Sequence, residues 1–197
     1  MKLKYYIFNK PYNVLSQFTR EAGNQSIADY FILDNKDIYP IGRLDKDSEG
    51  MLLLTNDKSL NAIVLSPKQA KSKTYLVQVE GQINKAAISK LCAGVTITVD
   101  QKAYHTLPAF AKIIDAPKYL WERTPPVRYR KDIPTSWVEV RIEEGKNRQV
   151  RKMLAEVGFP VLRLIRVAIQ DLYMDRIAPG DIQEIERVEI MKKLKIK

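Results

Sequence analysis

Cysteine, histidine and long apolar runs are the scarce features of this 197-residue chain. Cys92 is the single cysteine, so no internal disulfide can form, and this fits a reducing cytoplasm. It falls in an apolar helical pattern, which favours a core position over a nucleophile. His105 is the single histidine, so the chain lacks the ligands of the common structural zinc sites, and we expect no metal.

No stretch of the sequence has the length or the apolar character of a membrane span. The strongest apolar run, Met51-Leu52-Leu53-Leu54, is far too short to cross a bilayer. The first residues contain no long apolar segment and no small-residue cleavage site, so we expect no secretory signal. These absences predict a cytoplasmic protein without a membrane partner.

Positive charge is in excess. The chain has 33 Lys and Arg against 23 Asp and Glu, a net charge of +10. A basic protein attracts polyanions, which include nucleic acid, anionic membrane and acidic proteins. The placement of the cations is therefore more informative than their number.

Hydrophobic periodicity predicts an α+β chain with much antiparallel pairing. Alternating or continuous apolar patterns predict six strands, over residues 4–8, 51–55, 74–80, 95–99, 137–143 and 161–167. Capping residues and apolar stripes predict helices that begin near Ser26, Asp57, Asn84 and Val150, with Gly94 after the third. Residues 104–134 contain five prolines, which predict a long irregular segment.

The densest polar loop directly precedes the most apolar strand. Gly42 and Gly50 bracket it, and Asp45, Asp47 and Glu49 place carboxylates at every second position. The loop is open to three interpretations. It can be a solvated turn with a local ion pair, which composition alone favours. It can be a calcium loop, although the twelfth position is not the required Glu and no second helix follows. It can also carry one catalytic carboxylate that a nearby arginine keeps ionised.

Two further segments combine cations with polar or aromatic side chains. The run Gly145-Lys146-Asn147-Arg148-Gln149 leads into a helix with two more cations, Arg151 and Lys152. A helix N-terminus with arginines suits phosphate or RNA, although such a face can also be simply solvated. In Lys71-Ser72-Lys73-Thr74-Tyr75, the aromatic residue Tyr75 stands at the start of a strand, directly after two lysines. It can stack on a base or pack in the core, and alone the second is favoured.

Taken together, these segments resemble one family. The run Gly42-Arg43-Leu44-Asp45, with its continuation to residue 57, resembles the catalytic motif of the RsuA-type ribosomal RNA pseudouridine synthases. Lys73-Thr74-Tyr75 is similar to the tyrosine motif of that family, and residues 144–153 are similar to its basic motif. Order and spacing agree over nearly the whole chain. Residues 8–19, 106–109 and 125–137 resemble the RluE branch in particular.

The resemblance implies the pseudouridine synthase fold. This is an α+β fold with a mixed, mainly antiparallel sheet in two lobes, flanking helices and a central catalytic cleft. We expect residues 1–197 to form one catalytic domain whose two sub-lobes share that cleft. Many relatives carry an N-terminal S4 RNA-binding domain. Here the catalytic pattern begins by Tyr5, so we expect no S4 domain and an RNA grip that comes from the catalytic domain itself.

The family also implies a role for each motif. Asp45 is the nucleophile or charge stabiliser, Tyr75 stacks on a flipped-out base, and Arg151 pairs with Asp45. RNA contacts are expected from Arg43, Lys73, Lys146, Asn147, Arg148, Gln149 and Lys152. The isomerisation has no redox step and no net hydrolysis, so we expect no cofactor and no metal. The implied partner is large-subunit (23S) ribosomal RNA, modified near the peptidyl-transferase centre by a monomeric enzyme.

One stretch departs from the family pattern, and two rival functions stay open. Relatives usually end their last strand in a Gly-Pro turn, whereas this chain has Gln170-Asp171, so the path there does not follow from the resemblance. A non-catalytic ribosomal RNA-binding protein would also explain the charge, but not the Gly-Arg-Leu-Asp loop. A nuclease that uses Asp45, Asp47 and Glu49 would need a divalent cation.

Overall fold

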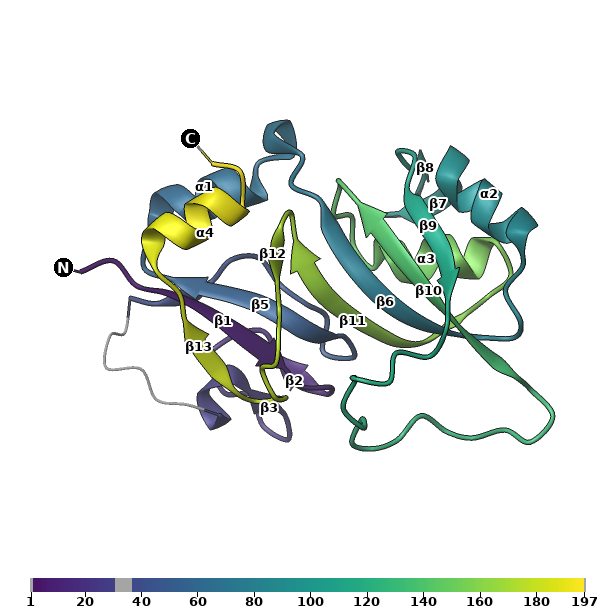
Figure 1. Cartoon of the computed structure of the whole chain (residues 1–197), viewed down its shortest axis with the longest axis horizontal. Coiled ribbons are helices and arrows are strands. Elements are labelled where there is room, and N and C mark those ends of the chain that lie inside the picture. The colour runs from purple at the N-terminus through teal and green to yellow at the C-terminus, as the bar shows by residue number, and fades with distance from the viewer. Residues whose placement is uncertain (1, 31–36, 197) are drawn as a thin grey trace. The chain divides into compact units, whose positions relative to one another are not determined.

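The computed structural model describes residues 2–30 and 37–196 of the chain (Figure 1). These residues divide into two compact units. Unit 1 combines the two ends of the chain, residues 1–71 and 165–197, and unit 2 is the continuous segment 72–164. Strand β11 (Val161–Ile169) begins in unit 2 and ends in unit 1.

Unit 1 is built on a mixed sheet. Strand β1 (Tyr5–Lys10) pairs antiparallel with both β5 (Glu49–Thr55) and β13 (Ile182–Glu184). The second part of β11 lies parallel to β5. The short strands β4 (Tyr39–Pro40) and β12 (Leu172–Tyr173) pair antiparallel with β5 and β11. A separate parallel pair joins β2 (Val14–Leu15) and β3 (Gln25–Ser26).

Strand β5 is buried along its whole length, as its apolar run predicts. Successive side chains of a strand point to opposite faces, so Met51 and Leu53 enter one hydrophobic cluster and Leu52 and Leu54 enter another. Two helices cover the first of these faces, α1 (Lys58–Leu65) and α4 (Arg187–Lys193), which lie side by side in Figure 1. The catalytic motif therefore leads into the most deeply buried strand of unit 1.

The polar cap of α1 confirms the predicted helix start. Asp57 accepts hydrogen bonds from the backbone N–H groups of Ser59 and Leu60. The helix predicted at Ser26 is only a 3₁₀ turn, Ile27–Asp29. A second 3₁₀ turn, Pro67–Gln69, follows α1. Phe31, which was expected on the first of these helices, lies outside the described residues.

The segment without the Gly-Pro turn forms a tight hairpin instead. Ile169 of β11 pairs directly with Leu172 of β12, so Gln170 and Asp171 alone make the connection. Gln170 takes the left-handed backbone conformation, with φ of 52°. Two-residue hairpin turns require positive φ, which accounts for this local path.

Unit 2 contains an antiparallel sheet in the order β6-β10-β9. Its strands are β6 (Lys73–Glu80), β10 (Thr135–Ile142) and β9 (Phe110–Ile114). Two helices, α2 (Lys85–Ala93) and α3 (Gln149–Glu156), pack on one face. A hairpin of β7 (Thr96–Val99) and β8 (Lys102–His105) completes the unit.

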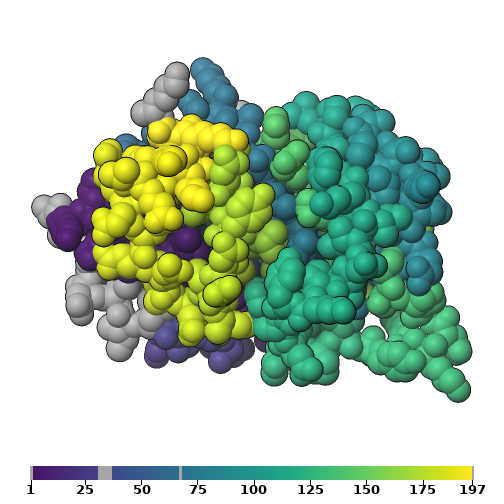
Figure 2. Space-filling view, viewed as in Figure 1, coloured from purple at the N-terminus to yellow at the C-terminus, as the bar shows by residue number. Residues whose placement is uncertain are grey.

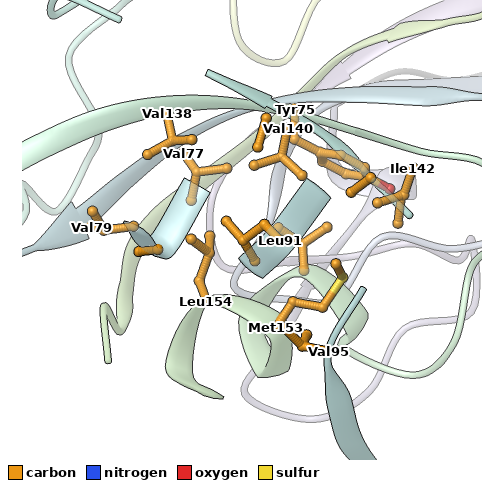
Figure 3. Packing of buried hydrophobic residues seen from close by; sticks show 14 of the residues in the cluster. Tyr75, Val77, Val79, Leu91, Val95, Val138, Val140, Ile142, Met153 and Leu154 are labelled. Atoms are coloured by element: carbon orange, nitrogen blue, oxygen red, sulfur yellow. The ribbon is translucent and has the colours of Figure 1, made fainter. Parts of the chain in front are cut away.

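The core of unit 2 follows the predicted periodicities. Val138, Val140 and Ile142 alternate along β10 and face the stripe of Met153 and Leu154 on α3, among the residues drawn in Figure 3. Cys92 is half-buried against this cluster and its thiol points to the carbonyl of Ala111, so it is part of the packing. The predicted core position of Cys92 is confirmed.

Two parts of the fold differ from expectation. The stretch predicted to be irregular, residues 104–134, holds the end of β8 and all of β9. Phe110–Ile114 does not alternate in hydrophobicity, and its strand forms because its backbone pairs with β10. The chain after residue 169 was not assigned from the sequence, yet it adds β12, β13 and α4 to unit 1.

The predicted α+β class is confirmed, with antiparallel pairs in both units and parallel pairs of β5 with β11 and of β2 with β3. Within residues 2–30 and 37–196, none of the helices is long and apolar enough to span a bilayer.

Candidate active site

Asp45 lies in the loop between β4 and β5 of unit 1. Its side chain is half-buried, between the exposed Arg43 and the buried Ser48. The loop closes on itself, because the backbone N–H of Ser48 donates to the carbonyl of Asp45 at 3.0 Å. The side chain of Leu44 anchors the loop by packing into the hydrophobic cluster that contains Leu52 and Leu54.

Both chain neighbours of Asp45 are fastened to the segment that follows β1. The hydroxyl of Ser16 donates to the carbonyl of Leu44 at 2.7 Å and accepts from its N–H at 3.1 Å. On the other side, the carbonyl of Lys46 accepts from the N–H of Asn13 at 2.8 Å. The backbone before and after Asp45 is therefore fixed by hydrogen bonds that no local turn supplies.

Lys10 is a buried lysine that contacts both the segment after β1 and the Asp45 loop. It is fully buried at the end of β1, opposite Gly50 of β5. Its ammonium group donates to the carbonyls of Pro11 at 2.9 Å and Val14 at 2.8 Å, with a longer bond to Lys46 at 3.4 Å. Sequence reasoning missed Lys10, because it follows the predicted strand 4–8 and stands directly before Pro11.

Burial dominates the electrostatics of Lys10. Loss of solvation lowers the pKa of its ammonium group from 10.5 to about 7, against the attraction of Glu49, Asp47 and Asp45. The positive charge of Arg166 makes a smaller contribution to this lowering of the pKa. The loop that bears Asp45 thus stands beside a lysine whose charge changes near neutral pH.

Gly50 allows β11 to approach the end of this loop. Its φ is +101°, and a Cβ placed there would lie 2.3 Å from the carbonyl oxygen of Arg166. The Arg166 side chain is buried and its Nε donates to the carbonyl of Met51 at 2.9 Å. Its Nη2 has no hydrogen-bond partner among the described residues. Arg166 is a second polar residue that sequence reasoning missed, and a cation within an apolar strand was its signal.

The three acidic residues of the loop do not assemble into a metal site. Among the described residues, which include Asp45, Asp47 and Glu49, no group of three or more His, Cys, Asp or Glu side chains is arranged to hold a metal ion. The calcium-loop interpretation therefore has no geometric support.

Tyr75 and Arg151 belong to unit 2. Tyr75 lies on β6 opposite Val140 and is 91% buried in the hydrophobic cluster, where Figure 3 shows its ring among the core side chains. Arg151 is half-buried in the first turn of α3. Asp45 is in unit 1, so the meeting of these three side chains stays a prediction.

The basic motif forms a turn that Glu144 organises. The Glu144 carboxylate accepts hydrogen bonds from the hydroxyl of Tyr104, the N–H of Leu107 and the amide of Gln149. The Gln149 amide oxygen accepts in turn from the N–H of Lys146 at 2.9 Å. Gln149, predicted to contact RNA, is thus buried and committed to the turn.

The other predicted RNA contacts differ in exposure. Lys146, Asn147 and Arg148 are exposed at the start of α3, where Arg148 adopts a left-handed φ of 52°. The ammonium of Lys146 lies 4.7 Å from the centre of the Tyr104 ring. Lys73 and Lys152 are half-buried in unit 2, whereas Arg43 is exposed in unit 1.

Comparison with known proteins identifies the family. Residues 4–156 match the model of the RNA pseudouridylate synthase family. The chain is 49% identical over 183 residues to the ribosomal large subunit pseudouridine synthase E of Vibrio parahaemolyticus, covering 93% of this chain and 74% of that protein. It is 44% identical over 175 residues to the protein of the same name from Xanthomonas axonopodis, covering 88% and 89%.

A solved structure agrees. The crystal structure of a pseudouridylate synthase superposes with a TM-score of 0.79 at 26% identity, over 98% of this chain and 74% of that one. The predicted pseudouridine synthase fold is thereby confirmed. The chain belongs to the RNA pseudouridylate synthase family, whose members are enzymes that isomerise uridine in RNA to pseudouridine.

Proposed function

We propose that this enzyme converts a uridine of large-subunit ribosomal RNA to pseudouridine, with Asp45 as the nucleophile. The names and the extent of similarity of the Vibrio and Xanthomonas relatives support the choice of RNA. The RluE-like segments extend the proposal to a uridine near the peptidyl-transferase centre. The assignment of the nucleophile rests on the hydrogen bonds that fix the backbone on both sides of Asp45, at Leu44 and at Lys46.

The reaction is an exchange of one bond for another. The bond between N1 of uracil and C1′ of ribose breaks, and a bond from C5 of uracil to C1′ forms. C5 loses its hydrogen as a proton, and N1 gains one, so atoms and electrons balance without oxidation or hydrolysis. A nucleophile for this exchange must be held still, because a displacement of about 1 Å can lower a rate about a hundredfold.

Tyr75 and Arg151 complete the proposal from unit 2. Tyr75 stacks on the flipped base, and its packing in the core cluster restricts where the ring can lie. Arg151 pairs with Asp45 and favours the ionised carboxylate. The exposed Lys146, Asn147 and Arg148 bind RNA phosphates with Lys73, Lys152 and Arg43.

Substitution at two neighbouring carboxylates tests the nucleophile. Asp45→Asn removes the nucleophilic oxygen while keeping the shape of the side chain, and Asp47→Asn is the matched control in the same loop. With a large-subunit ribosomal RNA transcript labelled with tritium at C5 of uridine, release of tritium follows the reaction. We expect Asp45→Asn to lose more than about a thousandfold in rate and Asp47→Asn to keep most of it.

Each alternative result has a definite meaning. Near-normal turnover by Asp45→Asn would reject the nucleophile. Turnover that disappears with a chelator would favour metal chemistry. Tritium release from small-subunit RNA alone would overturn the proposed substrate.

A further inference from the structure

The connection between β9 and β10 in unit 2 has features that the catalytic motifs do not explain. Residues 115–134 extend beyond the ends of both strands (Figure 1) and lie at the surface of the unit (Figure 2). Apart from turns, the segment has no regular secondary structure. Pro125 and Pro126 contribute no backbone N–H, which disfavours a strand there.

Long side chains nevertheless anchor this segment to the body of unit 2. The guanidinium of Arg123 donates to the carbonyls of Pro125 at 2.8 Å, Pro126 at 3.0 Å and Leu162 at 3.3 Å. The segment therefore has a defined turn that is tied to the start of β11.

Two further contacts hold the segment, one before and one after that turn. The guanidinium of Arg163 lies 5.7 Å from the centre of the Trp121 ring. On the far side, Arg130 forms an ion pair of 2.9 Å with Glu80 of β6. Between and beside these anchors, most of the remaining side chains are exposed, and Pro117, Leu120 and Val127 are half-buried.

The exposed side chains of residues 115–134 include aromatic and basic ones, together with three acidic ones, Asp115, Glu122 and Asp132. Tyr119 is 78% exposed and Tyr129 is 84% exposed. Arg128 and Lys131, on either side of Tyr129, are exposed as well. From residue 123 to residue 131 the sequence has four cations and no acidic residue. We call Tyr119, Arg128, Tyr129 and Lys131 the loop surface.

We propose that the loop surface is a second RNA-binding site, which takes a single-stranded part of the substrate RNA. A base stacks on Tyr129, a further base stacks on Tyr119, and Arg128 and Lys131 bind the adjoining phosphates. This inference rests on the proposed function, because it assigns the surface to the same substrate RNA.

The chemistry of the surface favours single-stranded RNA over other polyanions. Exposed aromatic rings alternating with cations are the usual means of binding unpaired bases, whereas duplex RNA hides its bases in the stack. Tyrosine and arginine are also common in protein interfaces, and Tyr129 stands between Arg128 and Arg130. An acidic protein partner is therefore an outcome that the test must distinguish.

Fluorescence anisotropy with the full-length enzyme tests the site. The probes are a fluorescein-labelled single-stranded oligouridine and an RNA duplex of the same length. We expect Tyr129→Ala to weaken oligouridine binding at least about fivefold, since stacking on one aromatic ring contributes that much or more. Tyr129→Phe should bind like the wild type, because stacking needs the ring and not the hydroxyl. Tyr39→Ala, at a tyrosine of unit 1 that is 60% exposed, is the matched control.

The phosphate contacts have their own signature. Arg128→Ala with Lys131→Ala should reduce the slope of log affinity against log salt by about 1.4, or roughly 0.7 for each lost contact. Lys85→Ala with Lys90→Ala removes the same charge from the exposed face of α2 and should leave the slope as it is. A uniform loss in both double variants would mean that only the overall charge matters.

The outcomes separate the inference from the proposed function. Equal affinity of Tyr129→Ala and Tyr39→Ala, or a wild type that does not bind oligouridine, overturns the loop surface even if the enzyme makes pseudouridine. Binding of an acidic polypeptide such as polyglutamate, with no binding of oligouridine, would replace it by a protein site. If the wild type forms no pseudouridine in any ribosomal transcript, the proposed function fails, whatever the affinity of the loop.

Discussion

The Asp45 loop of unit 1 and the 115–134 segment of unit 2 are both irregular, but they are held in opposite ways. Around Asp45 the backbone itself is fixed, by the buried groups of Lys10 and Ser16. In the 115–134 segment the fixed points are the ends of Arg123 and Arg130, and the backbone between them is exposed. A reacting carboxylate needs a rigid backbone, whereas a surface that follows a flexible strand needs only fixed ends. The two loops thus match the different requirements of the proposed nucleophile and of the proposed RNA-binding surface.

Gly50 offers the strongest test of the rigid loop. Gly50→Ala would place a methyl group 2.3 Å from the Arg166 carbonyl at a φ of +101°, and backbone atoms on both strands cannot yield. We expect a loss of at least about 4 kcal/mol in the free energy of unfolding, or no folded protein. Gly23→Ala is the control, because it has a similar φ of +75° but open space, and should lose about 1 kcal/mol. Urea unfolding measures both, and equal losses would mean that close packing at Gly50 is not required.

Lys10 makes the rigid loop sensitive to pH. Its pKa falls from 10.5 to about 7 on folding, so between these values the unfolded chain holds more protons at this site. The stability of the wild type relative to Lys10→Met should therefore rise as pH increases from about 7 to about 10, with a slope of at most about 1.4 kcal/mol per unit. Below about 7 the difference should be constant. Parallel curves from urea unfolding across this range would contradict the buried ammonium.

Ser16 tests whether fixing the backbone matters for the reaction. Ser16→Ala leaves the buried N–H and C=O of Leu44 without the hydroxyl, which should lower the free energy of unfolding by about 2 kcal/mol and turnover by about tenfold. Ser89→Ala removes an exposed hydroxyl that bonds within α2 and should change neither. Chemical denaturation and tritium release report the two effects. Lost stability with full turnover would show that Ser16 only supports the fold.

Arg123 tests the anchored loop, and its effect on stability should be the smallest. Arg123→Ala removes three hydrogen bonds to carbonyls near the surface, so we expect less than about 1 kcal/mol in the free energy of unfolding. Amide hydrogen exchange of residues 119–131 should nevertheless speed up, and oligouridine should bind more weakly. Lys90→Ala serves as the control, because it removes an exposed cation of α2, outside the loop surface, without these bonds. Unchanged exchange would mean that Arg123 is not needed to order the loop.

Local patterns predicted most regular elements of the fold. The apolar run of β5 and the alternation of β10 were both assigned correctly, because burial on two faces or on one face leaves a distinct period in the residues. The caps Asp57 and Asn84 marked true helix starts. Strand β9 escaped because its five residues have no period, and its order comes from pairing with β10.

The residues of the candidate site also divide into those that the sequence indicates and those that only the fold brings to the site. Asp45, Tyr75 and Arg151 could be selected because each stands in a segment that resembles a motif of the family. Lys10 and Arg166 were missed, because a lysine or arginine within or just after a strand pattern usually ends in solvent. The register of β1 against β5 and the approach of β11 at Gly50 bury them beside the loop.

The sequence by itself determined the α+β class and the family motifs, since these depend on residue type and spacing along the chain. Only the tertiary structure decided that Ser16, Asn13 and Lys10 hold the backbone on either side of Asp45, and that Tyr129 stands in solvent. The physical reason is that hydrogen bonds between distant segments, and the exposure of a side chain, depend on which backbones meet in space. A periodic pattern records which face of an element is buried, but not which neighbour buries it.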